Sequence, residues 1–102
     1  MDREKHKLDE FFKNIKKNFL NCKILLFGSR ARNEEWKTSD YDLIIVSDYF
    51  KGIHWLKRIS LVMSYWELDR DLDILPYTYE EFEHKLKESS FVKEIVSHSR
   101  EI

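Results

Sequence analysis

The sequence predicts an α/β or α+β fold, in which a small mixed β-sheet packs against helices. Short apolar runs are typical of buried strands, and longer segments between them carry apolar residues three and four positions apart, as amphipathic helices do. The predicted order is helix, strand, short helix, strand, long helix, strand and helix, which favours a layer of helices on a sheet. A chain of 102 residues has room for one hydrophobic core. We therefore expect a single domain over residues 1–102.

The first half of the chain begins with a helix and continues into a strand. Over residues 3–20, Lys and Glu fill one helical face and the other is apolar, with Leu8, Phe11, Phe12, Ile15 and Phe19. The run 23–27 predicts a buried strand that stops at a glycine. A short helix is predicted over 30–34, a polar loop over 35–39, and the second strand over 42–46.

The second half starts with a long helix over about residues 53–69, whose apolar positions are Leu56, Ile59, Val62, Met63 and Trp66. Residues 71–75 are predicted as the third strand. We expect this strand to stop at Pro76, because proline cannot donate to a sheet ladder. The remainder, from Tyr79 to about Ser99, is predicted as helix in one or two pieces, with Ser89-Ser90 as the joint.

The composition excludes several classes of protein. The chain has 18 Lys and Arg against 19 Asp and Glu, a net charge of −1, which argues against nucleic acid held by a basic surface. Cys22 is alone, so no internal disulfide is expected, and the four histidines lack the spacing of zinc ligands. No signal-like apolar core or membrane-length apolar run is present. We expect a cytoplasmic protein without a membrane span.

The candidate functional residues lie in three places: at the end of the first strand, at the start of the second strand and in the third strand. Asp40 and Asp42 are two positions apart, so a strand would place their carboxylates on the same side. Asp73 begins another strand that could lie beside them. Oxygen ligands of this kind suit Mg²⁺, and two such ions can serve an in-line displacement at phosphorus. Gly28 and Ser29 end the first strand, where a turn into a helix offers N–H groups to phosphate.

These residues resemble the minimal nucleotidyltransferases of the DNA polymerase beta superfamily, which include kanamycin nucleotidyltransferase and the antitoxins of certain two-gene prokaryotic modules. The resemblance spans essentially the whole chain. Ten residues separate Ser29 from Asp40, and the matching motifs are Gly28-Ser29-Arg30-Ala31-Arg32, Ser39-Asp40-Tyr41-Asp42-Leu43 and Asp73-Ile74-Leu75. At Asn33 many relatives have glycine, and asparagine is the next best residue for a left-handed turn.

The resemblance implies roles for individual residues. Gly28 and Ser29 would hold the triphosphate of ATP, Asp40 and Asp42 would bind Mg²⁺, and Asp73 would be the third ligand and candidate base. Two alternatives stay open. Asp71 has the same strand parity as Asp73, and Arg30 either reaches phosphate or forms an ion pair that holds the turn.

The resemblance also implies a function. We expect a Mg²⁺-dependent nucleotidyltransferase, most simply a protein adenylyltransferase, that moves AMP from ATP to an acceptor hydroxyl on a partner protein. In the resembling modules that partner is a helical toxin of the HEPN type, and the antitoxin would form a homo- or hetero-oligomer. The alternative is a non-catalytic antitoxin that masks its partner by contact, with nucleotide binding vestigial or regulatory. Antibiotic modification is less favoured, because such enzymes usually carry a second domain for the drug.

Overall fold

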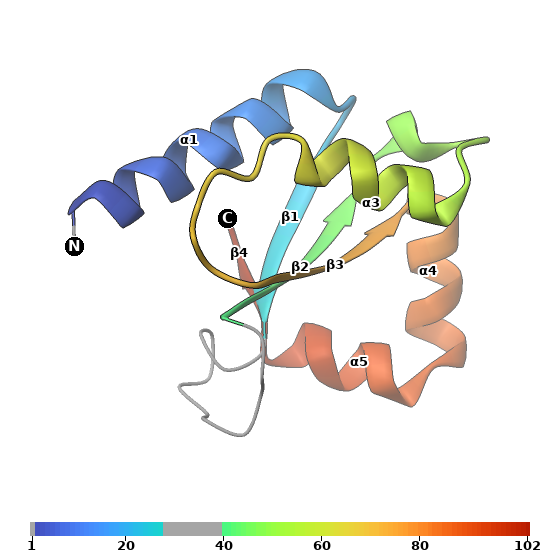
Figure 1. Cartoon of the computed structure of the whole chain (residues 1–102). Coiled ribbons are helices and arrows are strands. Elements are labelled where there is room, and N and C mark those ends of the chain that lie inside the picture. Colours follow the sequence, from blue (N-terminus) through green and yellow to red (C-terminus); the bar gives the residue numbers. More distant parts are fainter. Residues whose placement is uncertain (1, 28–39) are drawn as a thin grey trace.

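The computed structural model of the chain describes residues 2–27 and 40–102 (Figure 1). Its helices are α1 (Asp2–Asn18), α3 (Trp55–Met63), α4 (Tyr79–Glu88) and α5 (Ser90–Ser97). Its strands are β1 (Lys23–Phe27), β2 (Tyr41–Val46), β3 (Leu72–Tyr77) and β4 (Arg100–Glu101), and one 3-10 turn, η1 (Asp48–Phe50), follows β2. The predicted mixed sheet with packed helices is confirmed. The short helix predicted over 30–34 and the loop over 35–39 lie outside the described residues.

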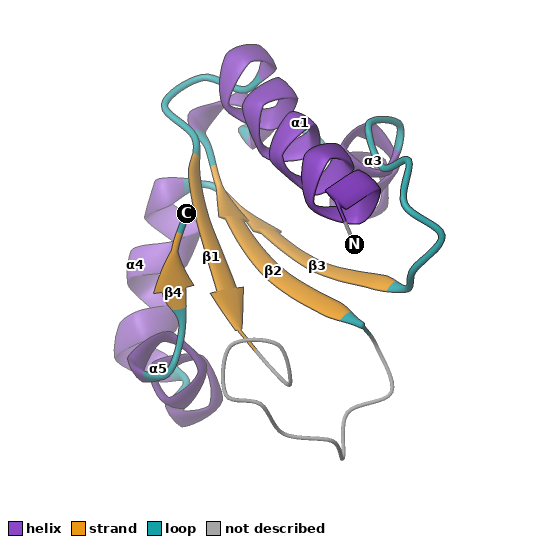
Figure 2. Ribbon diagram, turned by 90° about the vertical axis from the view of Figure 1, so that its left-hand side faces the viewer, coloured by secondary structure: helices purple, strands orange, loops and turns teal. Residues whose placement is uncertain are grey.

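The sheet is mixed, with the strand order β3-β2-β1-β4. Strands β2 and β3 are parallel, whereas β1 is antiparallel to both β2 and β4. Helices α1 and α3 lie on one face of the sheet, and α4 and α5 lie on the other (Figure 2). A parallel pair needs a crossover connection, and the segment with η1 and α3 supplies it.

The apolar stripe predicted for the first helix is buried against the sheet. Its side chains pack on alternate residues of β1 and β2, and the shared cluster includes Phe11, Phe12, Ile15, Phe19, Ile24, Leu26, Leu43 and Ile45. On the opposite face, the intervening strand residues pack with side chains of α4 and α5, in a cluster that includes Leu25, Phe27, Ile44, Val46, Tyr77, Phe82 and Val92. Because both faces are covered, every residue of β2 is buried.

The prediction that the third strand stops at Pro76 is wrong, because β3 continues to Tyr77 and Pro76 pairs in register with Ile45. The sheet order explains this difference, since β3 is an edge strand. The carbonyl of Pro76 points away from β2 and accepts a hydrogen bond from Arg58 Nη1 at 3.0 Å. In an extended strand the nitrogen and the carbonyl of one residue lie on the same side. The Pro76 nitrogen therefore also faces away from β2, so its lack of an N–H costs no hydrogen bond between β3 and β2.

Within the described residues, the other predicted helix and strand ends agree with the structure to within two residues, except for the end of the second long helix, and the 3-10 turn η1 was not predicted. The helix predicted over 53–69 ends at Met63, and Trp66 and Leu68 pack against the core from the segment that leads into β3. The two-residue strand β4 was not predicted. The joint near Ser89 is confirmed, since Ser89 ends α4 and its hydroxyl caps α5 through Val92 N–H at 3.1 Å.

Arg58 joins the two helical layers around the open edge of β3. Arg58 belongs to α3, and its side chain forms an ion pair with Glu81 of α4. The Arg58 side chain is only 7% exposed. Nη1 donates to Glu81 Oε1 at 2.6 Å and Nη2 donates to Oε2 at 3.1 Å. Nε donates to the carbonyl of Ile53 at 2.8 Å. This fork covers an edge that would otherwise offer its carbonyls to another chain.

No helix in the described residues is both long and apolar enough to cross a membrane. Gly52 follows η1 with φ of 78°, a left-handed conformation in which glycine carries no steric cost.

Candidate active site

The predicted site residues that the structure describes, Asp40, Asp42 and Asp73, lie at one end of the sheet. Gly28, Ser29 and Arg30 lie outside the described residues, but Phe27, which precedes them, is the cross-strand partner of Asp42. Strand β1 therefore ends directly beside Asp42. Strands β2 and β3 both begin at this same end.

Asp42 and Asp73 are register partners on adjacent parallel strands. By strand parity they share a face with Ile44 and Leu75, the face that α4 and α5 cover. Asp42 is 1% exposed, whereas Asp73 is exposed. The structure thus places one buried and one solvent-facing carboxylate side by side at the sheet end, on strands about 5 Å apart.

Asp40 lies two positions before Asp42 in the chain, immediately before β2, and is beside Asp71, which lies two positions before Asp73. Its Oδ2 accepts a hydrogen bond from the backbone N–H of Asp71 at 3.1 Å, and the N–H of Tyr41 donates to the Asp71 carbonyl at 3.0 Å. The Asp40 side chain therefore ties the start of β2 to the start of β3. Of the two alternatives for the third acid, Asp73 is the direct neighbour of Asp42 and Asp71 is the neighbour of Asp40.

The donor set at this end of the sheet fits a hard divalent cation. Carboxylate oxygens are the ligands that Mg²⁺ prefers, and Asp42 and Asp73 bring two carboxylates to this end of the sheet. Among residues 2–27 and 40–102, however, no three His, Cys, Asp or Glu side chains are set closely enough to form a metal-binding group. The three-ligand set of Asp40, Asp42 and Asp73 stays a prediction, and the described geometry supports its Asp42–Asp73 pair.

A polar network on the opposite face holds the same end of the sheet to α1. Tyr41 Oη donates to Glu4 Oε2 at 2.5 Å, and Arg70 Nε donates to Glu4 Oε1 at 3.2 Å. The hydrogen bond and the charge of Glu4 raise the pKa of Arg70, and Asp40 adds to this effect. Arg70 is thus a fixed positive charge next to the acidic strand ends. Sequence reasoning missed this network because its members are up to 66 positions apart, and no local spacing signals such a contact.

Comparisons with known proteins agree on one family. The family model described as "Polymerase beta, Nucleotidyltransferase" matches residues 7–102. A protein of Methanocaldococcus jannaschii, provisionally named a protein adenylyltransferase, is 45% identical over 49 residues. That stretch covers 48% of this chain and 48% of the relative, so the match spans about half of the relative's length.

Two solved structures share the fold. A crystal structure of a provisionally named nucleotidyltransferase from Sulfolobus solfataricus gives a TM-score of 0.56 at 21% identity and covers 96% of this chain and 74% of that one. A second structure with the same provisional name gives a TM-score of 0.61 at 20% identity, covering 97% of both chains. At these identities the likeness concerns the arrangement of helices and strands.

Proposed function

Because this chain belongs to the polymerase beta nucleotidyltransferase family, we propose that it is a Mg²⁺-dependent enzyme that transfers AMP from ATP to a hydroxyl group of a partner protein. The observation that carries the proposal is the register of Asp42 with Asp73 on parallel strands, next to the end of β1. This is where a triphosphate held after Phe27 would meet two carboxylates.

The acids would hold the metal through Asp42 and Asp73, with Asp40 as the further ligand that the family resemblance implies. Bound Mg²⁺ would neutralise charge on the triphosphate and favour deprotonation of the attacking hydroxyl. Asp42 is anchored in a buried strand, which fixes its position at little entropic cost during the reaction. Asp73 is exposed, so its carboxylate is accessible to an acceptor group that approaches from solvent.

The reaction exchanges one phosphorus–oxygen bond for another. The acceptor oxygen bonds to the α-phosphorus of ATP, the bond from that phosphorus to the leaving oxygen breaks, and pyrophosphate departs. Asp73 takes the hydroxyl proton, directly or through a water molecule. Gly28, Ser29 and Arg30 are predicted to hold the phosphates through backbone N–H groups, the hydroxyl and the guanidinium.

The choice of a protein acceptor is supported by the name of the M. jannaschii relative. We propose a helical toxin of the HEPN type as that partner, which would make this chain the antitoxin of a two-gene module and part of a hetero-oligomer.

The proposal is tested by transfer of labelled AMP to a co-purified partner. The purified chain is incubated with α-labelled ATP, Mg²⁺ and the partner, and label is followed by gel and intact mass. Asp42→Asn and Asp73→Asn should lower transfer by about 100-fold or more, since outer-sphere residues of metal sites alone are worth 10–100-fold. Asp71→Asn is the matched control and should transfer at close to the wild-type rate.

The variants separate the alternatives. If Asp71→Asn abolishes transfer and Asp73→Asn does not, Asp71 is the third acid. If Asp42→Asn labels the partner as well as wild type, the proposed active site is wrong. If wild type labels no acceptor and Asp42→Asn still neutralises the partner, the chain acts as a non-catalytic masking antitoxin.

A further inference from the structure

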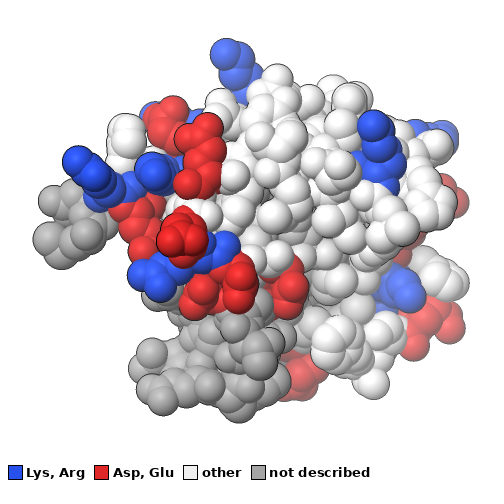
Figure 3. All heavy atoms as spheres, in the orientation of Figure 1, with Lys and Arg blue, Asp and Glu red and all other residues white. Residues whose placement is uncertain are grey.

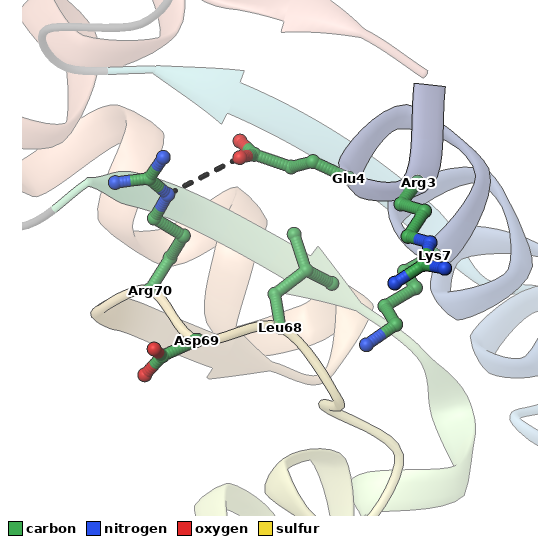
Figure 4. A pocket seen from close by; sticks show the side chains of 6 residues that line it. All are labelled: Arg3, Glu4, Lys7, Leu68, Asp69 and Arg70. Carbon is green, nitrogen blue, oxygen red and sulfur yellow. Dashed lines mark hydrogen bonds and ion pairs between the residues drawn. The ribbon is translucent and has the colours of Figure 1, made fainter. Parts of the chain in front are cut away.

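We propose that a pocket between α1 and the start of β3 docks an acidic segment of the acceptor protein. The pocket has a volume of about 330 Å³ and opens on the face of the sheet opposite to Asp42 and Asp73. Figure 4 shows the side chains around it, which come from the first turns of α1 and from the segment before β3: Arg3, Glu4, Lys7, Leu68, Asp69 and Arg70. This inference rests on the proposed function, since it names how that function's protein substrate is held.

The charges around the pocket favour an anionic ligand. Glu4 is engaged by Arg70 and Tyr41, and the Asp69 carboxylate points away from Arg3 and Lys7 (Figure 4). In the described part of the chain, no carboxylate lies within ion-pair distance of Arg3 or Lys7. One wall of the pocket therefore presents two cations to a ligand, and guanidinium groups bind carboxylates with good geometry.

The pocket also has an apolar element, because Leu68 lies between the charged walls and is largely buried. A ligand that pairs a carboxylate with a short aliphatic stem fits this combination, as glutamate or aspartate side chains of a peptide do. Charged side chains of both signs gather on this side of the molecule, over α1 and the segment leading into β3, whereas the surface over α3 is mainly uncharged (Figure 3). The two cations, Arg3 and Lys7, suit one or two carboxylates of a peptide, whereas a nucleic acid backbone is bound by many Lys and Arg side chains.

The position of the pocket suits an acceptor rather than the nucleotide. Asp42 and Asp73 project from the face covered by α4 and α5, so a triphosphate held by them does not fill a pocket on the α1 face. Arg70 nevertheless directly precedes Asp71, whose N–H binds Asp40 Oδ2. Arg70 and Asp73 are three residues apart, a span of at most about 10 Å in extended chain.

Binding to the full chain is measured by anisotropy of a fluorescent hexaglutamate peptide. Arg3→Glu/Lys7→Glu is compared with Lys13→Glu/Lys17→Glu, a matched control that makes the same change of net charge on exposed positions of the same helix. The pocket variant should bind at least about tenfold more weakly than wild type, and the control should bind within about twofold of it. Arg3→Gln/Lys7→Gln, which only removes the two charges, should show the same direction of change.

The outcomes separate this inference from the proposed function. Equal weakening in the pocket and control variants, or no weakening in either, overturns the docking site. Displacement of the peptide by ATP, with loss of ATP binding in the Arg3→Glu/Lys7→Glu variant, also overturns it and assigns the pocket to the nucleotide. In transfer assays, the pocket variant should raise the KM for the acceptor and leave kcat unchanged. Peptide binding as expected without any transfer would refute the proposed function alone.

Discussion

Replacement of Arg58 by alanine is expected to lower the free energy of unfolding by about 3–4 kcal/mol, although Arg58 belongs to no apolar core stripe. The guanidinium makes four hydrogen bonds to three partners in the described structure: the carbonyls of Ile53 and Pro76 and the carboxylate of Glu81. Its side chain is 7% exposed, so these bonds are shielded from competing water.

The expected loss of stability is the sum of the costs of losing each interaction of Arg58. The Glu81 side chain is 44% exposed and returns to water, so loss of the ion pair costs about 1 kcal/mol. The two carbonyls each lose a charged donor, at about 1 kcal/mol apiece. Two aromatic rings, 5.8 and 5.9 Å from the guanidinium carbon, lose a cation–π contact worth about 0.5 kcal/mol. For a domain of this size the melting temperature should fall by roughly 12 °C or more.

The assay is urea unfolding and thermal melting of Arg58→Ala beside Lys57→Ala, an exposed neighbour on the same helix. Lys57→Ala should stay within about 0.5 kcal/mol of wild type. Arg58→Lys should recover only part of the loss, because an ammonium group cannot form the bidentate fork. If Arg58→Ala and Lys57→Ala have the same stability, the bridge around the β3 edge does not stabilise the fold as argued.

The same pair makes a signed prediction about pH. The hydrogen bond from Arg58 lowers the pKa of Glu81 below its ordinary value of 4.5, and the Thr78 backbone N–H contributes in the same direction. A depressed folded-state pKa stabilises the protein above pH 4.5, and this stability is lost as the pH falls through the folded pKa. The stability difference between wild type and Glu81→Gln should therefore shrink below pH 4.5. A difference that grows as the pH falls would contradict the assignment.

Three further changes test other parts of the structure. Asp73→Asn should stabilise the metal-free protein by about 0.2–1 kcal/mol in urea unfolding, because it removes one of two like charges that are register partners; a loss of stability would speak against the Asp42–Asp73 pair. Burial raises the pKa of the Cys22 thiol to about 12. At pH 8 iodoacetamide should therefore label the folded protein at least about 100-fold more slowly than the urea-unfolded chain. Equal labelling rates would refute the burial of Cys22. Ser89→Ala removes the cap of α5 and should cost about 1 kcal/mol in urea unfolding, against less than about 0.5 kcal/mol for Ser97→Ala at the helix end; equal costs would show that the cap contributes nothing.

Much of the fold was predictable because its signals are local. The apolar stripe over 3–20 packs as expected, and the apolar run at 23–27 has the same bounds as β1. The serine pair that was predicted as a joint separates α4 from α5, since a serine hydroxyl serves the backbone of its own neighbours. Spacing within a helix or strand is sufficient to predict such features.

The candidate site was predictable only in part. The pattern Asp40-Tyr41-Asp42 placed two acids on one side of a strand, and the motif suggested a later acid without choosing between Asp71 and Asp73. The register of the parallel pair β2–β3 sets Asp73 beside Asp42 and Asp71 beside Asp40. That register depends on how the crossover through α3 packs, which no local pattern encodes.

The sequence by itself determined the order of elements, the apolar faces and the presence of the Gly-Ser and Asp-x-Asp motifs, because each depends on neighbours a few positions apart. Only the tertiary structure decided that β3 is an edge strand that tolerates Pro76, that Arg58 reaches Glu81 around that edge, and that Arg70 meets Glu4 beside the acids. These features join segments that are far apart in the chain. Their partners are selected by the packing of the whole domain, so their physical cause is the free energy of the assembled core and not the propensity of any one segment.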